Sequence, residues 1–175
     1  MNKELFIEEV KKLGLSLTKE QLESLDIYCK FLIEYNNHTN LTAIKEEDQI
    51  YLKHFYDSIT FIKSIDLNNY KTLIDIGTGA GFPGMVLKIL YPNLEVTLLD
   101  SNNKKIKFLE ELSKKLNIKG IHYYNGRAED FCKKNRETFD IVTARAVSNL
   151  PVLSELCIPL TKQNGYFIAM KGSNL

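Results

Sequence analysis

The stretch that most constrains the fold runs from Leu73 to Gly84 and reads Leu-Ile-Asp-Ile-Gly-Thr-Gly-Ala-Gly-Phe-Pro-Gly. Its apolar start is typical of a buried strand, and a helix is expected directly after its glycine-rich turn. Gly77, Gly79 and Gly81 let the backbone bend tightly and approach a ligand that a Cβ would hold away. In this context the motif predicts a nucleotide-binding turn, and a turn without a ligand is the less favoured interpretation.

From Lys71 onward, short apolar runs alternate with helical patterns, which is typical of a parallel sheet built from strand–helix–strand units. The expected strands are Thr72–Ile76, Glu95–Leu99, Ile121–Tyr124, Phe139–Ala144 and Tyr166–Met170. The expected helices between them cover about residues 83–90, 103–116 and 149–160. We therefore predict an α/β fold with a Rossmann-like sheet.

The beginning of the chain carries helical patterns instead. A capping-box pattern at Thr18 and Gln21 predicts the start of an amphipathic helix over residues 18–35, and a shorter helix is expected before it. The polar residues 36–40 are expected to form a loop, and a third helix is expected over residues 48–64.

These patterns divide the 175 residues into an N-terminal helical region over residues 1–68 and a sheet domain over residues 69–175. Composition agrees with an ordinary folded protein, because 44% of the residues are hydrophobic and 26% are charged. The formal net charge of +1 neither favours nor excludes a nucleic-acid partner, because basic residues can still gather on one face.

Cysteine usage and hydropathy indicate the compartment. Cys29, Cys132 and Cys157 are odd in number and lie outside any Cys-x-x-Cys pattern, so we expect reduced packing residues and no metal site. No apolar run approaches the roughly 18 residues that would cross a bilayer, and the first residues lack the blocks of a signal peptide. We expect a cytoplasmic protein without a membrane partner.

Asp100 stands at the end of the second expected strand, about 20 residues beyond the glycine turn. A carboxylate there can accept hydrogen bonds from both hydroxyls of a ribose, which predicts an adenosine-type ligand. The alternative is a cap on the following helix, for which Asp100 or Ser101 would serve. The two roles are compatible, and we favour the ribose.

Two features favour S-adenosylmethionine over a nicotinamide cofactor. Asp75 lies two residues before Gly77, where an anion would repel a pyrophosphate but would tolerate a sulfonium with an amino group. Arg127–Asp130 follows the third strand, where a methyltransferase places polar side chains and amides around the adenine. Glu129 could instead be an exposed acid in the first turn of a short helix. An NAD-dependent oxidoreductase and a non-catalytic domain that binds S-adenosylmethionine or RNA remain the alternatives.

Arg145 follows the fourth expected strand, in a sequence unlike the loops used for methylation of amino groups or of pyrimidine carbons. Its planar guanidinium can bind the carboxylate of the cofactor or a phosphate of RNA. A simple ion pair with Asp140 or Glu155 is an equally favoured interpretation.

Several short motifs occur together along the whole chain: Asn40-Leu41-Thr42, His54-Phe-Tyr-Asp57-Ser58, Gly77–Gly84, Leu98–Ser101, Arg127–Glu129, Arg145-Ala146 and Lys171-Gly172. In these motifs the chain resembles the small-subunit ribosomal RNA methyltransferase G family, also called glucose-inhibited division protein B. The resemblance implies a class I S-adenosylmethionine-dependent methyltransferase that methylates N7 of guanine 527, in the 530 loop of 16S rRNA, as free RNA or within the small subunit. It also implies that the cofactor lies against Gly77, Phe82, Ala128, Glu129 and Arg145, with Asp100 on the ribose. Gly79 and Gly81, in the same glycine turn as Gly77, are further candidates for binding the cofactor.

That reaction needs no general base, because guanine N7 already bears a free lone pair. No catalytic residue is therefore expected, and the rate would come from alignment and from stabilisation of the cationic purine. His54, Asp57, Arg145 and Lys171 are the candidates for holding the RNA or shaping its pocket. His54 and Asp57 lie three residues apart on one predicted helix, so they could simply be hydrogen-bonded to each other.

The sequence stops at Leu175, just after the fifth expected strand, so the comparison with the resembled family predicts a sheet without that family's usual closing strands. We therefore expect Tyr166–Met170 to be an exposed apolar edge that could pair with another chain.

Overall fold

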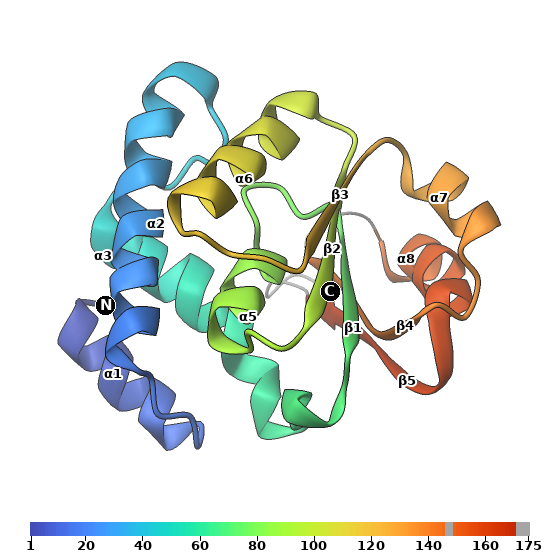
Figure 1. Ribbon diagram of the computed structural model, residues 1–175, viewed down its shortest axis with the longest axis horizontal. Coiled ribbons are helices and arrows are strands. Elements are labelled where there is room, and N and C mark those ends of the chain that lie inside the picture. Colours follow the sequence, from blue (N-terminus) through green and yellow to red (C-terminus); the bar gives the residue numbers. More distant parts are fainter. Residues whose placement is uncertain (146–148, 171–175) are drawn as a thin grey trace.

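A computed structural model describes residues 1–145 and 149–170 (Figure 1). Five parallel strands form one sheet in the order β3-β2-β1-β4-β5. They are β1 (Thr72–Ile76), β2 (Glu95–Asp100), β3 (Ile121–Asn125), β4 (Phe139–Arg145) and β5 (Thr161–Met170). The α/β class and all five expected strands are confirmed. The strand order reverses at β1 and β4, and in such sheets ligands bind beyond the carboxyl ends of the strands at this point.

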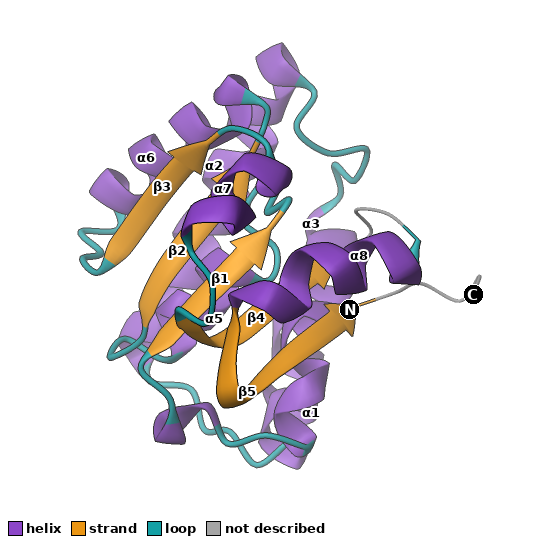
Figure 2. Ribbon diagram, turned by 90° about the vertical axis from the view of Figure 1, so that its right-hand side faces the viewer, coloured by secondary structure: helices purple, strands orange, loops and turns teal. Residues whose placement is uncertain are grey.

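Helices cover both faces of the sheet (Figure 2). One face packs against α5 (Gly84–Leu90) and α6 (Asn103–Lys115), and the other face carries α7 (Ala128–Lys134) and α8 (Leu150–Cys157), followed by the short 3₁₀ helix η4 (Ile158–Leu160). Two clusters of buried apolar residues correspond to these two interfaces. The three cysteines are free and buried, as expected, and no helix in the described part of the chain is long and apolar enough to cross a membrane.

The N-terminal region is helical, as predicted, and lies outside the α5–α6 layer (Figure 1). Its elements are α1 (Lys3–Lys12), α2 (Lys19–Thr39), α3 (Glu47–Ile50), the π-helical turn η1 (Tyr51–Tyr56), α4 (Asp57–Ile59) and the 3₁₀ turns η2 (Thr60–Lys63) and η3 (Leu67–Asn69). The capping box at Thr18 and Gln21 is confirmed by both of its hydrogen bonds.

The predicted loop over residues 36–40 was wrong, because α2 continues to Thr39. The Asn36 side chain is buried and makes two hydrogen bonds to the backbone of Thr42, so it folds the chain back along the helix. Asn40 then ends the helix in the left-handed conformation, with φ of 52°. The sequence pattern identified polar residues but could not show that one of them was paired inside the fold.

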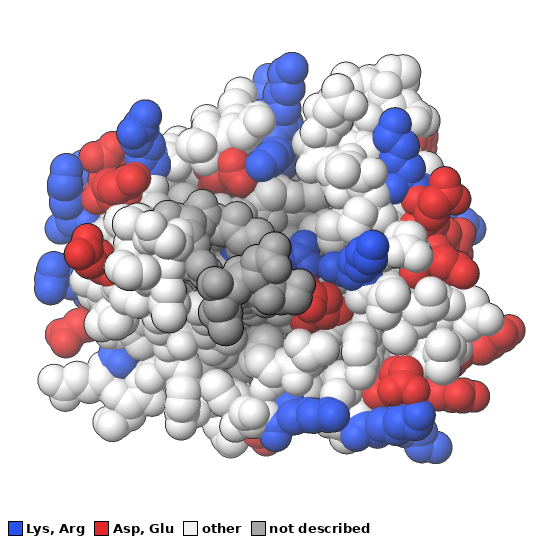
Figure 3. Space-filling view, turned by 180° about the vertical axis from the view of Figure 1, so that it is seen from behind, with Lys and Arg blue, Asp and Glu red and all other residues white. Residues whose placement is uncertain are grey.

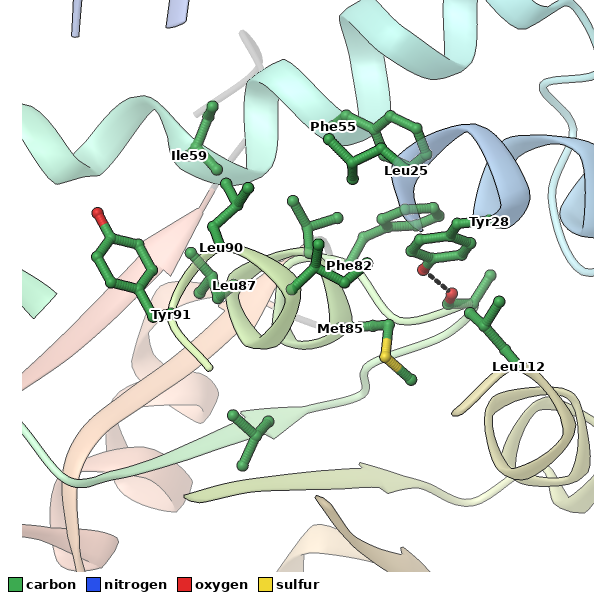
Figure 4. Packing of buried hydrophobic residues seen from close by; sticks show 14 of the residues in the cluster. Leu25, Tyr28, Phe55, Ile59, Phe82, Met85, Leu87, Leu90, Tyr91 and Leu112 are labelled. Atoms are coloured by element: carbon green, nitrogen blue, oxygen red, sulfur yellow. Dashed lines mark hydrogen bonds between the residues drawn. The ribbon is translucent and has the colours of Figure 1, made fainter. Parts of the chain in front are cut away.

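One hydrophobic core joins the N-terminal helices to the sheet (Figure 4). Tyr28, from α2, is fully buried, and its hydroxyl donates a hydrogen bond to the carbonyl of Ala80 in the glycine turn. Its ring is stacked on Phe82, with centroids 5.4 Å apart. Because a single cluster draws side chains from both parts of the chain, the division into residues 1–68 and 69–175 stays a prediction.

In the described residues, β5 pairs with β4 alone and forms an edge of the sheet. The strand begins at Thr161, five residues earlier than expected, because an irregular register lets both ends pair with β4. Gly165 fits there since a Cβ would lie 2.5 Å from the carbonyl oxygen of Asp140. Tyr166 remains 46% exposed and contacts the ring of Tyr70.

Candidate functional site

A cavity of about 640 Å³ opens at the carboxyl ends of the first four strands. Its walls come from the ends of β1, β2 and β4, from the segment after β3 and from α8. The residues that line it are Ile76, Gly77, Leu99, Asp100, Ser101, Lys105, Gly126, Arg127, Ala128, Glu129, Arg145, Val152 and Leu156. Five of the predicted cofactor residues are thus brought together, namely Gly77, Asp100, Ala128, Glu129 and Arg145.

Asp100 is almost completely buried at the floor of this cavity. Its Oδ2 accepts a hydrogen bond from the amide of Gly79, and its Oδ1 accepts one from the amide of Asn102, both at 2.9 Å. The helix cap is Asn102, whose side chain accepts a hydrogen bond from the amide of Lys104, so the alternative interpretation, in which Asp100 or Ser101 caps α6, was wrong. A carboxylate has about four acceptor positions, so Asp100 retains capacity for ligand hydroxyls.

Asp75 lies beneath the glycine turn and does not line the cavity. Its carboxylate accepts hydrogen bonds from the hydroxyl of Thr78, the amide of Gly84 and the hydroxyl of Thr143, at 2.7, 2.8 and 3.1 Å. Burial raises the pKa of Asp75 to about 6, although these bonds and Arg145 oppose the shift. Asp75 therefore stabilises the turn from beneath through these hydrogen bonds, and its charge does not face the cavity.

The glycines of the turn have different neighbours. Gly77 lines the cavity, whereas Gly79 and Gly81 do not. Gly81 has φ of +101°, and a Cβ there would lie 2.5 Å from the Tyr28 hydroxyl oxygen, so packing against α2 requires this glycine. A Cβ at Gly84 would lie 2.4 Å from the side chain of Leu98. Close packing thus accounts for two of the glycines that the sequence motif presents as one set.

Phe82 is also outside the cavity wall. It is buried between two rings, Tyr28 on one side and His54 on the other, and the His54 and Phe82 centroids are 4.2 Å apart with an interplanar angle of 12°. The Arg145 guanidinium carbon lies 5.2 Å from the Phe82 centroid. Phe82 therefore contacts the groups that surround Arg145.

Arg145 is held by groups that lie about 90 residues earlier in the chain. Its Nη1 donates to the carbonyl oxygen of Lys53 at 3.0 Å and to Oδ2 of Asp57 at 3.1 Å, and its Nη2 donates to Nδ1 of His54 at 3.1 Å. The predicted ion pair exists, but with Asp57 instead of Asp140 or Glu155.

Asp140 has other partners. It accepts hydrogen bonds from the backbone and hydroxyl of Thr72 and pairs with Lys162 at 2.9 Å. Burial alone would raise its pKa, yet these partners lower the pKa of Asp140 to about 2.

His54 and Asp57 share a face, as their spacing predicted, and both point to Arg145. Between them the described contacts run through that guanidinium and not directly from one to the other. Their helix was expected to be continuous over residues 48–64, but it passes through the π-helical turn η1 and ends in 3₁₀ geometry. Lys171 and Ala146 lie outside the described residues.

The apolar walls of the cavity were not predicted from the sequence. Ile76 and Leu99 could have been identified as the last apolar residues before the strand ends. Val152 and Leu156 come from α8, whose approach to the cavity has no local sequence signal.

A family model described as rRNA small subunit methyltransferase G, or GidB, matches residues 21–175. The chain belongs to this family. A Ribosomal RNA small subunit methyltransferase G from Macrococcus caseolyticus is 52% identical over 174 residues, which are 99% of this chain and 73% of that protein. The one from Bacillus subtilis is 48% identical over 176 residues, covering 99% of this chain and 74% of that protein.

Solved structures support the fold of this GidB family member. A putative caffeoyl-CoA O-methyltransferase from Staphylococcus aureus has a TM-score of 0.56 at 20% identity, covering 81% of this chain and 65% of that one. A putative S-adenosyl-L-methionine-dependent methyltransferase from Methanococcus maripaludis also has a TM-score of 0.56, at 17% identity, covering 71% of this chain and 60% of that one. The sheet is thus of the class I methyltransferase type, and family membership favours a methyltransferase over the oxidoreductase alternative.

Proposed function

We propose that the protein transfers a methyl group from S-adenosylmethionine to N7 of a guanine in 16S rRNA, guanine 527 of the 530 loop, as free RNA or within the small ribosomal subunit. This activity would place it in the cytoplasm. The observation that supports the proposal is the chemistry of the cavity, which combines the buried carboxylate of Asp100, the partly buried guanidinium of Arg145 and apolar walls in one space at the switch point of the sheet.

The parts of S-adenosylmethionine match these groups. Asp100 on β2 can accept from the ribose hydroxyls, and Ala128 and Glu129 can contact the adenine beside the apolar Leu99. Arg145 ends β4, two strands away from β2 and thus about 10 Å across the sheet, where its guanidinium can bind the cofactor carboxylate. When bound, this cofactor would supply a methyl group activated on a sulfonium.

The surroundings of His54 also fit an N7 target. Guanine N7 needs no deprotonation, and both ring nitrogens of His54 are already hydrogen-bonded, to Arg145 and to Thr42, so His54 is not placed to act as a general base. The residues of the chain would accelerate transfer by aligning the reacting atoms and excluding water.

An rRNA target rests on the names of the relatives, and surface charge adds little to it. Figure 3 shows Lys and Arg interspersed with Asp and Glu over one face instead of a single basic field. RNA recognition would then depend on the rim of the cavity, where Lys105 and Arg127 line the wall.

Two measurements test this function. Calorimetry of the purified chain with S-adenosylhomocysteine and with NAD should show binding of the first ligand only. Transfer of radiolabelled methyl groups to 16S rRNA and to small subunits that lack the modification should then give N7-methylguanine, located by chemical cleavage. Binding of NAD alone would overturn the cofactor assignment, and methylation at another atom or another nucleotide would overturn the target.

A further inference from the structure

The strongest unexplained feature is the number of groups that converge on Arg145. Its side chain is 17% exposed, and the guanidinium is bound by the carbonyl of Lys53, the ring of His54 and the carboxylate of Asp57. An ion pair with Asp57 would suffice to neutralise the charge. The additional partners fix the direction of the guanidinium plane.

The protonation state of His54 follows from its partners. A guanidinium can only donate, so Nδ1 of His54 must accept and carries no proton. The single ring proton is therefore on Nε2, which lies 3.0 Å from Oγ1 of Thr42 and donates to it. Burial, followed by the nearby Arg145 charge, lowers the pKa of His54 to about 4, in agreement with a neutral ring.

Thr42 is itself held in place. Its amide donates to Oδ1 of Asn36 and its carbonyl accepts from Nδ2 of the same residue, both at 2.9 Å. Its hydroxyl oxygen also accepts from the amide of Ile44 at 3.1 Å. A chain of contacts thus runs from the end of α2 through Thr42 and His54 to Arg145 at the cavity.

We infer that His54, oriented by Thr42, is a positioning residue that aims Arg145 at the carboxylate of the bound cofactor. The inference rests on the proposed function and gives His54 a role toward the cofactor, whereas the sequence suggested that His54 and Asp57 hold the RNA or shape its pocket. Among the described residues, the contacts of Arg145 use three of its five N–H donors, which leaves two for an oxyanion in the cavity that it lines. A guanidinium fixed in advance loses less side-chain entropy when it binds a carboxylate.

Two ligands that differ only in the amino-acid part provide the test. S-Adenosylhomocysteine has the carboxylate, whereas 5′-methylthioadenosine has the same adenosine and sulfur without it. His54→Phe keeps an aromatic ring on Phe82 but removes the acceptor, and His54→Asn keeps an acceptor at the Nδ1 position. Thr42→Val removes the hydroxyl that orients the ring.

By calorimetry, His54→Phe should weaken S-adenosylhomocysteine about tenfold, the order expected when one hydrogen bond to the charged guanidinium is lost. Thr42→Val should weaken it in the same direction but less, because it removes only the neutral hydrogen bond that orients the ring. Both should leave 5′-methylthioadenosine within about twofold of the wild type. His54→Asn should recover most of the lost affinity. Thermal unfolding of each variant shows that it is folded before binding is compared.

The other outcomes are distinct. Equal weakening of both ligands would make His54 a merely structural residue, and no weakening would separate it from the cofactor. Unchanged binding of both ligands with a raised KM for rRNA would assign Arg145 to an RNA phosphate. Each of these overturns the inference while leaving the methyltransferase proposal intact, whereas a wild-type chain that binds neither ligand would overturn the proposed function itself.

Discussion

Asp100 connects the second strand to the glycine turn, because its Oδ2 accepts a hydrogen bond from the amide of Gly79 at 2.9 Å. Its Oδ1 accepts a hydrogen bond from the amide of Asn102. The same carboxylate thus shapes the turn and faces the cavity. The proposed ligand role and the structural role of Asp100 fall on one side chain, so testing them separately needs variants that differ in only one of the two roles.

Asp100→Ala should weaken S-adenosylhomocysteine by about 1.5–3 kcal/mol, because charge-assisted hydrogen bonds to the ribose are lost. Asp100→Asn should also weaken it, since a carboxamide has one oxygen and cannot accept from both backbone amides. Asn102→Ala is the control: it removes the cap of α6 and should cost about 1 kcal/mol of stability with little change in affinity. Equal affinities for all three variants and the wild type would leave Asp100 without a ligand role.

Asp75 and His54 should contribute to stability with opposite dependence on pH. Burial raises the pKa of Asp75 to about 6, so between about pH 4 and 6 the folded chain holds a proton that the unfolded chain has lost, and rising pH lowers the free energy of unfolding. Burial and Arg145 lower the pKa of His54 to about 4, so the unfolded chain takes up a proton below about pH 6.5 that the folded chain refuses. Falling pH therefore removes the stability that His54 contributes.

In the wild type these two contributions offset each other, and single variants should expose them. Asp75→Asn can keep its acceptor for Thr78 and Gly84 and donate to the Thr143 hydroxyl, so it should fold. As the pH rises from 4 to 6.5, the free energy of unfolding of Asp75→Asn should increase relative to that of the wild type, by about 2–3 kcal/mol. Over the same pH change, the free energy of unfolding of His54→Asn should decrease relative to that of the wild type, by a similar amount. Urea unfolding at several pH values measures this. Parallel curves for both variants and the wild type would show that neither group titrates in that window.

Two glycines of the turn should respond differently to a methyl group. At Gly84 a Cβ would lie 2.4 Å from Leu98 and 2.9 Å from Oδ2 of Asp75. Gly84→Ala must therefore displace these side chains and should lower the free energy of unfolding by about 1–3 kcal/mol. At Gly79 a Cβ would meet no atom within 4 Å, so only its φ of +61° carries a cost, about 1 kcal/mol. Thermal unfolding should place Gly84→Ala below Gly79→Ala. The reverse order would mean that backbone conformation, not packing, limits this turn.

The edge position of β5 should be visible in hydrogen exchange. Strand β1 lies between β2 and β4, whereas β5 pairs with β4 alone in the described residues, so amides in Phe167–Met170 should exchange faster than those in Ile74–Ile76. Strand β4, with neighbours on both sides, serves as the internal control. Equal protection of β5 and β1 in a dilute sample would show that another segment or another molecule covers the edge.

Much of this architecture could be predicted because its signals are local. The five strands follow from apolar runs between turn residues, the start of α2 from its capping box, and the location of the cavity from a glycine turn and an acid at consecutive strand ends. Asp100, Ala128 and Glu129 reach the cavity for the same reason, since parallel strands bring their carboxyl ends to one edge.

Family identity was likewise available from short motifs, but the contacts of several polar residues outside those motifs were not. The Asn36 side chain bonds to the backbone of Thr42, and Asp75 lies beneath the turn instead of lining the cavity. Both directions depend on which partner the folded chain supplies, and residue type alone does not specify it.

The partners of Arg145 were the contacts that the sequence predicted least well. Asp57 is 88 residues away, and neighbouring acids such as Asp140 and Glu155 offered equally reasonable pairs. The sequence by itself determined most of the secondary structure, the sheet class and the edge at which the cavity opens, because these depend on periodicity and on backbone chirality. Only the tertiary structure decided which charges meet and which glycines are packed tightly, because those contacts join segments whose approach is set by burial of a shared core.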